Sequence, residues 1–193
     1  QEANKALDSA GWKLNKDGIR EKNGKTLSLV YKTSAGIKVL ENIQVYICAQ
    51  FKEIGVQCLV KNEPPRTFLG TSVPHGEFDL AMYGQQVPPD TSLTSYFSSN
   101  EIPSEKNSWA GGNSMRIQSK ELDQILKSFD SELNVTKRNQ LIGKMQDYFI
   151  KDYTFIPLYH RKEALVVPQK LQGLVDIYDG TGFSNPELWQ LAD

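Results

Sequence analysis

The sequence has few of the side chains on which catalysis and metal binding most often depend. Two histidines and two cysteines occur among 193 residues, no CxxC pair is present, and neither histidine lies near a cysteine. A zinc site or a redox motif is therefore not expected. The motifs GxSxG, GxGxxG, HExxH and the P-loop are also missing. Their absence argues against the common hydrolase, dinucleotide-binding, metalloprotease and nucleotide-hydrolase classes.

The chain also lacks an excess of charge and a long apolar run. It carries 22 basic and 23 acidic side chains, which gives a formal net charge of −1, and it has no basic block. This balance argues against nucleic acid or an anionic membrane surface as a partner. No apolar run approaches the roughly 18 residues of a membrane-spanning helix. The chain begins at Gln1 rather than Met, and we expect it to be part of a longer polypeptide.

What is present is typical of one α/β domain. Hydrophobic residues make up 39% of the chain and charged residues 23%, as in ordinary globular proteins. Residues 26–32 and 56–61 have the composition of strands, and residues 38–54 carry an apolar stripe with helical spacing between them. This order predicts a right-handed βαβ unit with parallel strands, joined by a third strand at residues 78–83.

The second half of the sequence predicts two helices and then two strands. Apolar spacing marks one helix from Leu122 to Leu133 and a second through Leu141 to Phe149, with a cap near Asn134. Residues 155–159 and 164–167 have the composition of strands, although Pro157 directs the first toward an edge. His160 is then expected to be a half-buried strand residue.

The two cysteines leave two interpretations open. Cys48 lies in the predicted helix and Cys58 in the strand that follows it. Two separate, partly buried thiols are the simpler expectation. A disulfide requires that the helix and the strand bring the two residues together.

A concentration of aromatic and amide side chains follows the third predicted strand. Ligands of α/β sheets gather at the loops beyond strand ends. Aromatic rings and amides suit a hydroxyl-rich ligand or a peptide backbone. The alternative is that the aromatic residues only pin a long loop to the core. His75, in a Pro-His-Gly stretch, is expected to be a solvated loop residue. The side chains concerned are Tyr83, Gln85, Gln86, Tyr96, Phe97, Trp109 and Asn113.

The order of short motifs along the chain resembles the C-terminal lobe of the family 5 extracellular solute-binding proteins, the peptide-, nickel- and oligosaccharide-type receptors of ABC importers. No single motif is specific, but their order covers nearly all of the sequence. The motifs are Ala10-Gly11-Trp12, Asp17-Gly18-Ile19-Arg20, Asn23-Gly24-Lys25, residues 51–56 (FKEIGV), residues 76–80 (GEFDL), Leu122-Asp123, Arg138, residues 156–159 (IPLY), Val175 after Gly173, and residues 185–189 (NPELW).

This resemblance implies a type II periplasmic-binding-protein-like lobe, with a mixed sheet flanked by helices. Residues 1–193 would form a single C-terminal lobe of a larger two-lobe receptor, with residues 174–193 returning toward the missing lobe. The protein would be an extracytoplasmic monomer, free or lipid-tethered, that needs no cofactor. It would bind a small solute, a peptide or an oligosaccharide, and deliver it to ABC permease subunits.

The chain departs from the family at one informative place. Peptide receptors of this family commonly carry Gly-Trp-x-x-Asp after the third strand, and that aspartate pairs with the peptide's α-ammonium. Here Gln85 stands for the tryptophan and Pro88 for the aspartate, and Asp90 aligns only with a gap. The free-amine anchor is therefore in doubt. Our candidate ligand-binding residues are Tyr83, Gln85, Gln86, Asp90, Trp109 and Asn113.

Two other interpretations belong to different functional classes. An enzyme would use Asp79 or Asp90 and would place two titratable groups together in a cleft. A sensor or scaffold of the same fold, without a transport role, would tolerate the loss of the usual aspartate. We favour the receptor, with no catalytic or metal-binding residues.

Overall fold

The computed structural model describes residues 1–87, 91–160, 166–174 and 186–192. The chain forms two compact units, which are described separately. The first comprises Gln1–Gly84 and Ser95–Lys120, and the second comprises Gln85–Thr94 and Glu121–Asp193. In the described part of the chain, no helix combines the length and the apolar character needed to cross a membrane.

The first unit begins with a short helix and a small antiparallel sheet. Its elements are α1 (Glu2–Ser9), β1 (Lys13–Leu14), β2 (Arg20–Lys22) and β3 (Lys25–Thr26). Gly11 adopts a left-handed φ of +86° directly after the helix, which a glycine does at little cost. β2 pairs with both β1 and β3. The three strands form a small antiparallel sheet.

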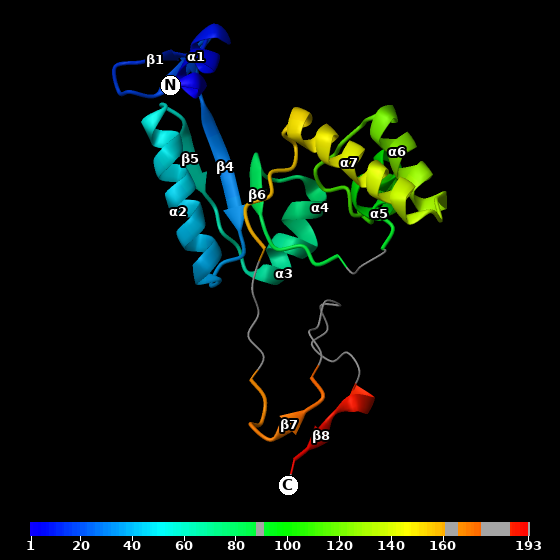
Figure 1. The fold of residues 1–193 in the computed structure, drawn as a ribbon. Coiled ribbons are helices and arrows are strands. Elements are labelled where there is room, and N and C mark those ends of the chain that lie inside the picture. Colours follow the sequence, from blue (N-terminus) through cyan, green and yellow to red (C-terminus); the bar gives the residue numbers. More distant parts are fainter. Residues whose placement is uncertain (88–90, 161–165, 175–185, 193) are drawn as a thin grey trace. The chain divides into compact units, whose positions relative to one another are not determined.

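A parallel three-stranded sheet forms the centre of the first unit (Figure 1). Its elements, with the crossing helix, are β4 (Ser28–Thr33), α2 (Lys38–Glu53), β5 (Gln57–Val60) and β6 (Leu80–Met82). The strand order is β5-β4-β6, with Tyr31 opposite Val60 on one side and Leu80 on the other. The predicted βαβ unit and its third strand are therefore confirmed.

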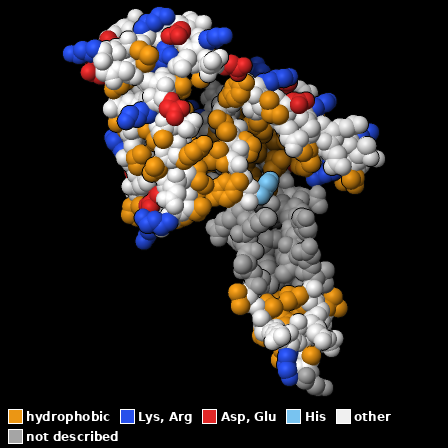
Figure 2. Space-filling view, turned by 60° about the vertical axis from the view of Figure 1, so that its left-hand side comes forward, with side chains coloured by type: hydrophobic (Ala, Val, Ile, Leu, Met, Phe, Trp, Pro, Cys, Tyr) orange, Lys and Arg blue, Asp and Glu red, His pale blue; other side chains and the backbone are white. Residues whose placement is uncertain are grey.

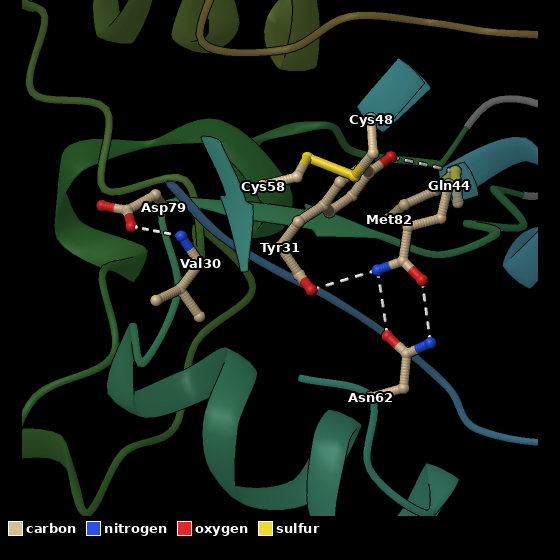
Figure 3. The surroundings of a disulfide bond; sticks show 8 residues. All are labelled: Val30, Tyr31, Gln44, Cys48, Cys58, Asn62, Asp79 and Met82. Atoms are coloured by element: carbon tan, nitrogen blue, oxygen red, sulfur yellow. Dashed lines mark hydrogen bonds between the residues drawn. A yellow bond between two sulfur atoms is a disulfide. The ribbon is translucent and has the colours of Figure 1, made fainter. Parts of the chain in front are cut away.

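Gln44 and a disulfide connect α2 to the sheet (Figure 3). The buried amide of Gln44 donates to Tyr31 O and exchanges two hydrogen bonds with Asn62. Cys48 and Cys58 are bonded, with their Cα atoms 5.6 Å apart. The expectation of two separate thiols was wrong, because α2 packs over β5 and brings the two side chains together.

A helical segment, residues 65–75, and a long loop, residues 95–119, complete the first unit. They comprise α3 (Pro65–Thr67), the π-helical turn η1 (Phe68–Ser72), α4 (Val73–His75), α5 (Thr94–Phe97), η2 (Ser99–Glu101) and η3 (Glu105–Asn107). α5 forms a short helix inside the loop. The apolar core of this unit consists of Tyr31, Val56, Phe68, Val73, Met82 and Ile117.

Two helices form the main part of the second unit, α6 (Lys120–Ser131) and α7 (Val135–Asp152). The Asn134 side chain accepts a hydrogen bond from Lys137 N, which confirms it as the N-cap of α7. The guanidinium of Arg138 lies 4.0 Å above the Phe129 ring and donates to Phe129 O. The buried apolar side chains of this unit are Leu122, Leu126, Phe129 and Met145.

The C-terminal region differs from the prediction. Residues 155–159 are exposed and form no strand, and His160 is exposed rather than half-buried. Pro157 has no N–H to donate. Half of the second predicted strand, residues 164 and 165, lies outside the described residues, and residues 166 and 167 form no strand. An unpredicted antiparallel pair joins β7 (Leu171–Gln172) to β8 (Gln190–Leu191), and η4 (Pro186–Leu188) precedes β8.

Charges of both signs are dispersed over the visible surface, with hydrophobic side chains between them (Figure 2). On α2 the exposed apolar residues are Val39, Val45 and Tyr46. Such single apolar residues are usual on protein surfaces. The dispersed charge agrees with the near-neutral balance of the sequence.

Candidate functional site

Tyr83 leaves the end of β6, which is the edge where ligands of parallel sheets collect. Its ring contacts Phe68 edge-on, with centroids 6.1 Å apart. Burial raises the pKa of the Tyr83 phenol, and a hydrogen bond with Ser114 opposes this shift. The half-buried ring is therefore held by the helical segment on one side and by the long loop on the other.

Trp109 lies in the long loop and stacks on His75 of α4. The ring centroids are 3.9 Å apart and the planes differ by 30°. His75 was predicted to be a solvated loop residue, but it is half-buried at the end of a helix. The prediction failed because the ring's partner lies far along the sequence, and no local pattern marks the pair.

Asn113 holds the long loop together. Its side chain is completely buried. The amide donates to the carbonyls of Phe97, Ser98 and Ile117, and its oxygen accepts from Ile117 N. These backbone contacts occupy the hydrogen-bonding groups of the amide. Asn113 therefore builds the loop that carries Trp109.

The remaining predicted residues follow Tyr83 in the second unit. Gln85 and Gln86 are exposed, and the Gln85 amide lies 3.5 Å from Gln86 O. Asp90 lies outside the described residues. The structure thus joins Tyr83, Trp109 and Asn113 through one loop.

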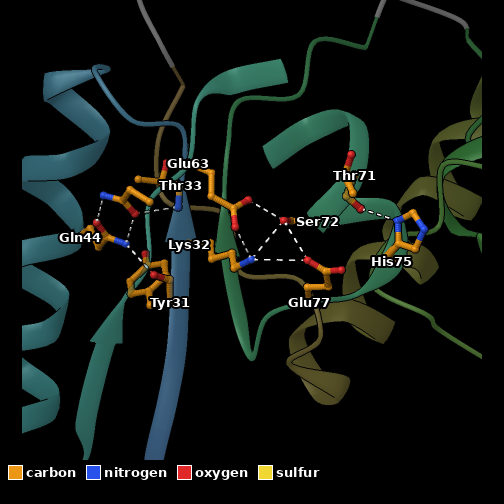
Figure 4. Close-up of polar contacts among 10 residues, drawn as sticks. Tyr31, Lys32, Thr33, Gln44, Glu63, Thr71, Ser72, His75 and Glu77 are labelled. Atoms are coloured by element: carbon orange, nitrogen blue, oxygen red, sulfur yellow. Dashed lines mark hydrogen bonds and ion pairs between the residues drawn. The ribbon is translucent and has the colours of Figure 1, made fainter. Parts of the chain in front are cut away.

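A buried charge network was not found by sequence reasoning, because an isolated lysine normally indicates solvent exposure. Lys32 on β4 is 5% exposed. Its Nζ lies 2.6 Å from Glu63 Oε1, 3.1 Å from Ser72 Oγ and 3.8 Å from Glu77 Oε2 (Figure 4). Ser72 Oγ also donates to Glu63. The network connects β4, the segment after β5 and the helical segment, and its partners compensate the buried ammonium.

Glu63 is expected to make the stability of the first unit sensitive to acid. The hydrogen bond from Lys32, followed by that from Ser72, lowers the pKa of Glu63 below its ordinary value of 4.5. The Glu63 carboxylate binds a proton more readily in the unfolded chain than in the folded chain. Its contribution to the free energy of unfolding is therefore complete above pH 4.5. It is lost as the pH falls through the lower folded pKa. The free energy of unfolding, measured with urea, should therefore fall less in E63Q than in wild type when the pH is lowered from about 5 to about 3. Equal losses would contradict this assignment.

Of the two aspartates considered for catalysis, Asp79 is described and Asp90 lies outside the described residues. The Asp79 carboxylate accepts a hydrogen bond of 2.7 Å from Val30 N, and so fastens the start of β6 to β4. Across the described ranges, no group of three or more histidine, cysteine or acidic side chains is placed to hold a metal ion.

A shallow depression of about 370 Å³ lies between α6 and α7 and contains none of the predicted site residues. Its lining is mostly polar and consists of Ser128, Ser131, Glu132, Lys137, Gln140, Leu141 and Lys144.

Known proteins match the chain in sequence and in fold. The oligopeptide-binding protein AppA of Bacillus subtilis is 28% identical over 207 residues, which cover 100% of this chain and 34% of AppA. The structure of AppA in complex with a nonapeptide matches with a TM-score of 0.81 at 25% identity, over 100% of this chain and 37% of that chain. This chain thus spans about a third of the length of AppA.

Two further proteins extend the match. The oligopeptide-binding protein OppA of Lactococcus lactis subsp. cremoris is 51% identical over 61 residues, 31% of this chain and 10% of OppA. A mannohexaose-bound periplasmic oligopeptide-binding protein of Thermotoga maritima matches with a TM-score of 0.67 at 25% identity, over 81% of this chain and 30% of that chain.

The sequence model described as bacterial extracellular solute-binding proteins, family 5 Middle, matches residues 1–104. This is more than half of the chain, and the parallel sheet of the first unit lies within it. The α/β fold predicted from the sequence is that of the matched solute-binding proteins. The chain belongs to the family 5 bacterial extracellular solute-binding proteins.

Proposed function

We propose that this chain is part of the substrate-binding component of an ABC importer, and that the whole receptor binds a peptide. The match to AppA over the full chain, in sequence and in fold, is the observation that carries this proposal. AppA is named as an oligopeptide-binding protein, and its structure contains a nonapeptide. The proposed activity is binding followed by delivery to permease subunits, and no bond is made or broken.

The chain would act as the C-terminal lobe of a two-lobe receptor that is a monomer. A solute between two lobes stabilises the closed form because contacts from both lobes exist only when the receptor is closed. Residues 174–193 would return toward the other lobe. The exposed apolar side chains of residues 155–159 support a further contact with the rest of the polypeptide.

The proposed ligand-binding residues lie at the carboxyl edge of β6 and in the long loop. Tyr83 and Trp109 would offer ring surfaces, and the amides of Gln85 and Gln86 would bond to peptide groups. Asn113 would act indirectly, by holding the loop of Trp109. Asp90 stays a candidate partner for the peptide's ammonium, in place of the aspartate that Pro88 replaces.

The proposed location is outside the cytoplasm, either free in a periplasm or tethered to a membrane. The Cys48–Cys58 disulfide supports it, because disulfides persist in exported proteins and are rare in reducing cytosol. The family is itself one of extracellular proteins.

A thermal-shift assay of the full-length receptor tests the proposal. A ligand that binds only the folded protein stabilises it by mass action, by about 2.7 kcal/mol when its concentration is a hundred times Kd. Pools of peptides of five to nine residues should raise Tm, while pools of oligosaccharides should leave it unchanged. A receptor that responds to neither pool would favour the sensor or scaffold interpretation.

An oligosaccharide is the second candidate solute. The mannohexaose-bound Thermotoga maritima protein carries an oligopeptide-binding name, and it matches 81% of this chain. The missing Gly-Trp-x-x-Asp aspartate also removes a feature that a free peptide amine would use. A rise in Tm with oligosaccharides alone would replace the peptide proposal with this one.

A further inference from the structure

Trp109 is held in an unfavourable backbone conformation by a firmly bonded turn. Ser108 and Trp109 have φ values of +54° and +61°, which are uncommon for residues other than glycine and especially for bulky ones. Trp109 N donates to Ser104 O at 2.8 Å, and the Ser104 N–H donates to the side chain of Asn107. The loop therefore fixes the position of the indole ring instead of leaving it free on the surface.

A second set of contacts fixes the histidine on which the indole stacks. His75 Nδ1 lies 2.8 Å from Thr71 O (Figure 4). Arg116 donates to Pro74 O, next to His75, and to Pro103 O, next to the start of the Trp109 turn. Its guanidinium thus joins the two segments that carry the rings. Both rings belong to the first unit, so their stacking is part of one compact body.

The stacked pair also presents polar atoms that the chain does not use. Within the described ranges, neither the Trp109 indole N–H nor His75 Nε2 makes a hydrogen bond. Both side chains are half-buried. The indole N–H is not among the buried polar atoms that lack a partner, so it reaches solvent. A rigid ring surface beside a free donor is suited to a flat apolar group whose neighbour is a carbonyl oxygen.

We propose that Trp109 and His75 form a subsite for one flat side chain of the bound peptide, an aromatic ring or a proline. The Trp109 indole N–H donates to a neighbouring peptide carbonyl. His75 acts as a positioning residue that sets the orientation of the indole. The inference rests on the proposed function, since it specifies which peptides that site prefers.

Positional peptide pools presented to the full-length receptor test the subsite. In each pool one position is fixed as Phe, Trp, Pro or Ala, and Kd is measured by calorimetry. Wild type should prefer the ring-containing pools to the Ala pool about fivefold at one position, which is the usual scale of an aromatic contact. W109A should lose that preference, and it should bind every pool more weakly because it also lacks the indole donor. H75A should lose most of the preference, and H75F, which restores a stacking ring, should recover it.

The variants also distinguish failure of the subsite from failure of the proposed function. Far-UV circular dichroism and Tm identify a variant that fails to fold. If W109A fails to fold, W109F is measured in its place, because it retains a ring at this position. Binding of all pools by W109A and H75A with wild-type preferences would overturn the subsite and leave the proposed function intact. Binding of oligosaccharide pools alone would overturn the proposed function, and the peptide subsite with it.

Discussion

Replacing Arg20 with methionine is expected to lower the free energy of unfolding by about 3 kcal/mol. The Arg20 side chain is 1% exposed, and its guanidinium donates to two backbone carbonyls, Ile54 O at 2.8 Å and Trp12 O at 2.7 Å. Methionine leaves both carbonyls without these donors. Urea unfolding followed by circular dichroism gives the change directly.

The size of this effect follows from the place of Arg20 in the first unit. The same guanidinium bonds to Asn4 and Asp8 of α1, so one side chain connects α1, the small antiparallel sheet and the end of α2. Asp8 is half-exposed, and its ion pair adds little by itself. The effect therefore comes from unpaired backbone groups and not from a surface charge.

Lys13 provides a matched control in the same small sheet. Its side chain is 71% exposed and lies 4.0 Å from the same Asp8, so K13M should change stability by no more than about 0.5 kcal/mol. R20K should recover only part of the loss, because a single ammonium cannot replace a guanidinium fork. If R20M and K13M unfolded at the same urea concentration, the role assigned to Arg20 would be wrong.

Removing the Cys48–Cys58 disulfide is expected to cost about 2.5–3 kcal/mol. The bond closes a loop between residues separated by 10 positions, and the chain-entropy relation gives this value for a loop of that length. The C48A/C58A variant should unfold at lower urea concentration than wild type, with the fastest hydrogen exchange at the end of α2 and in β5.

Reduction provides an independent measure of the same bond. Dithiothreitol should destabilise wild type by a similar amount and should have no effect on C48A/C58A. Wild type that keeps its stability in the reductant would show that the bond contributes nothing, and it would also remove the structural support for an extracytoplasmic location.

Local sequence patterns predicted those elements whose causes are local. The apolar stripe of Leu40, Ile43 and Ile47 marks α2, because helical spacing places these residues on one face. Gly55, with a φ of +80°, comes directly after the range 38–54 predicted to be helical. Asn134 caps α7 through its own side chain. Each of these signals lies within a few residues of the structure that it produces.

The features that were missed depend on partners far along the chain. Lys32 is buried because Glu63 and Ser72 meet it across the sheet and the helical segment. No spacing around Lys32 indicates these partners. The expected strand at 155–159 is absent for a related reason, since a strand requires a neighbour and the apolar composition of a segment does not supply one.

In the candidate site, too, the sequence predicts some features and the tertiary structure decides the others. Tyr83, Trp109 and Asn113 are candidates from the sequence because they follow the third strand, where α/β proteins bind ligands. Their position in the sequence does not assign their roles. Burial with four backbone hydrogen bonds gives Asn113 a structural part, while stacking on His75 leaves Trp109 half-exposed with a free donor.

The sequence by itself determined the α/β order, the cap of α7, the family and the region of the chain in which to look for a site. Only the tertiary structure decided that the two cysteines are joined, that Lys32 is buried and that His75 supports Trp109. The physical reason is the range of the interactions. Periodicity and capping act within a few residues, whereas burial, pairing and stacking depend on groups that folding alone brings together.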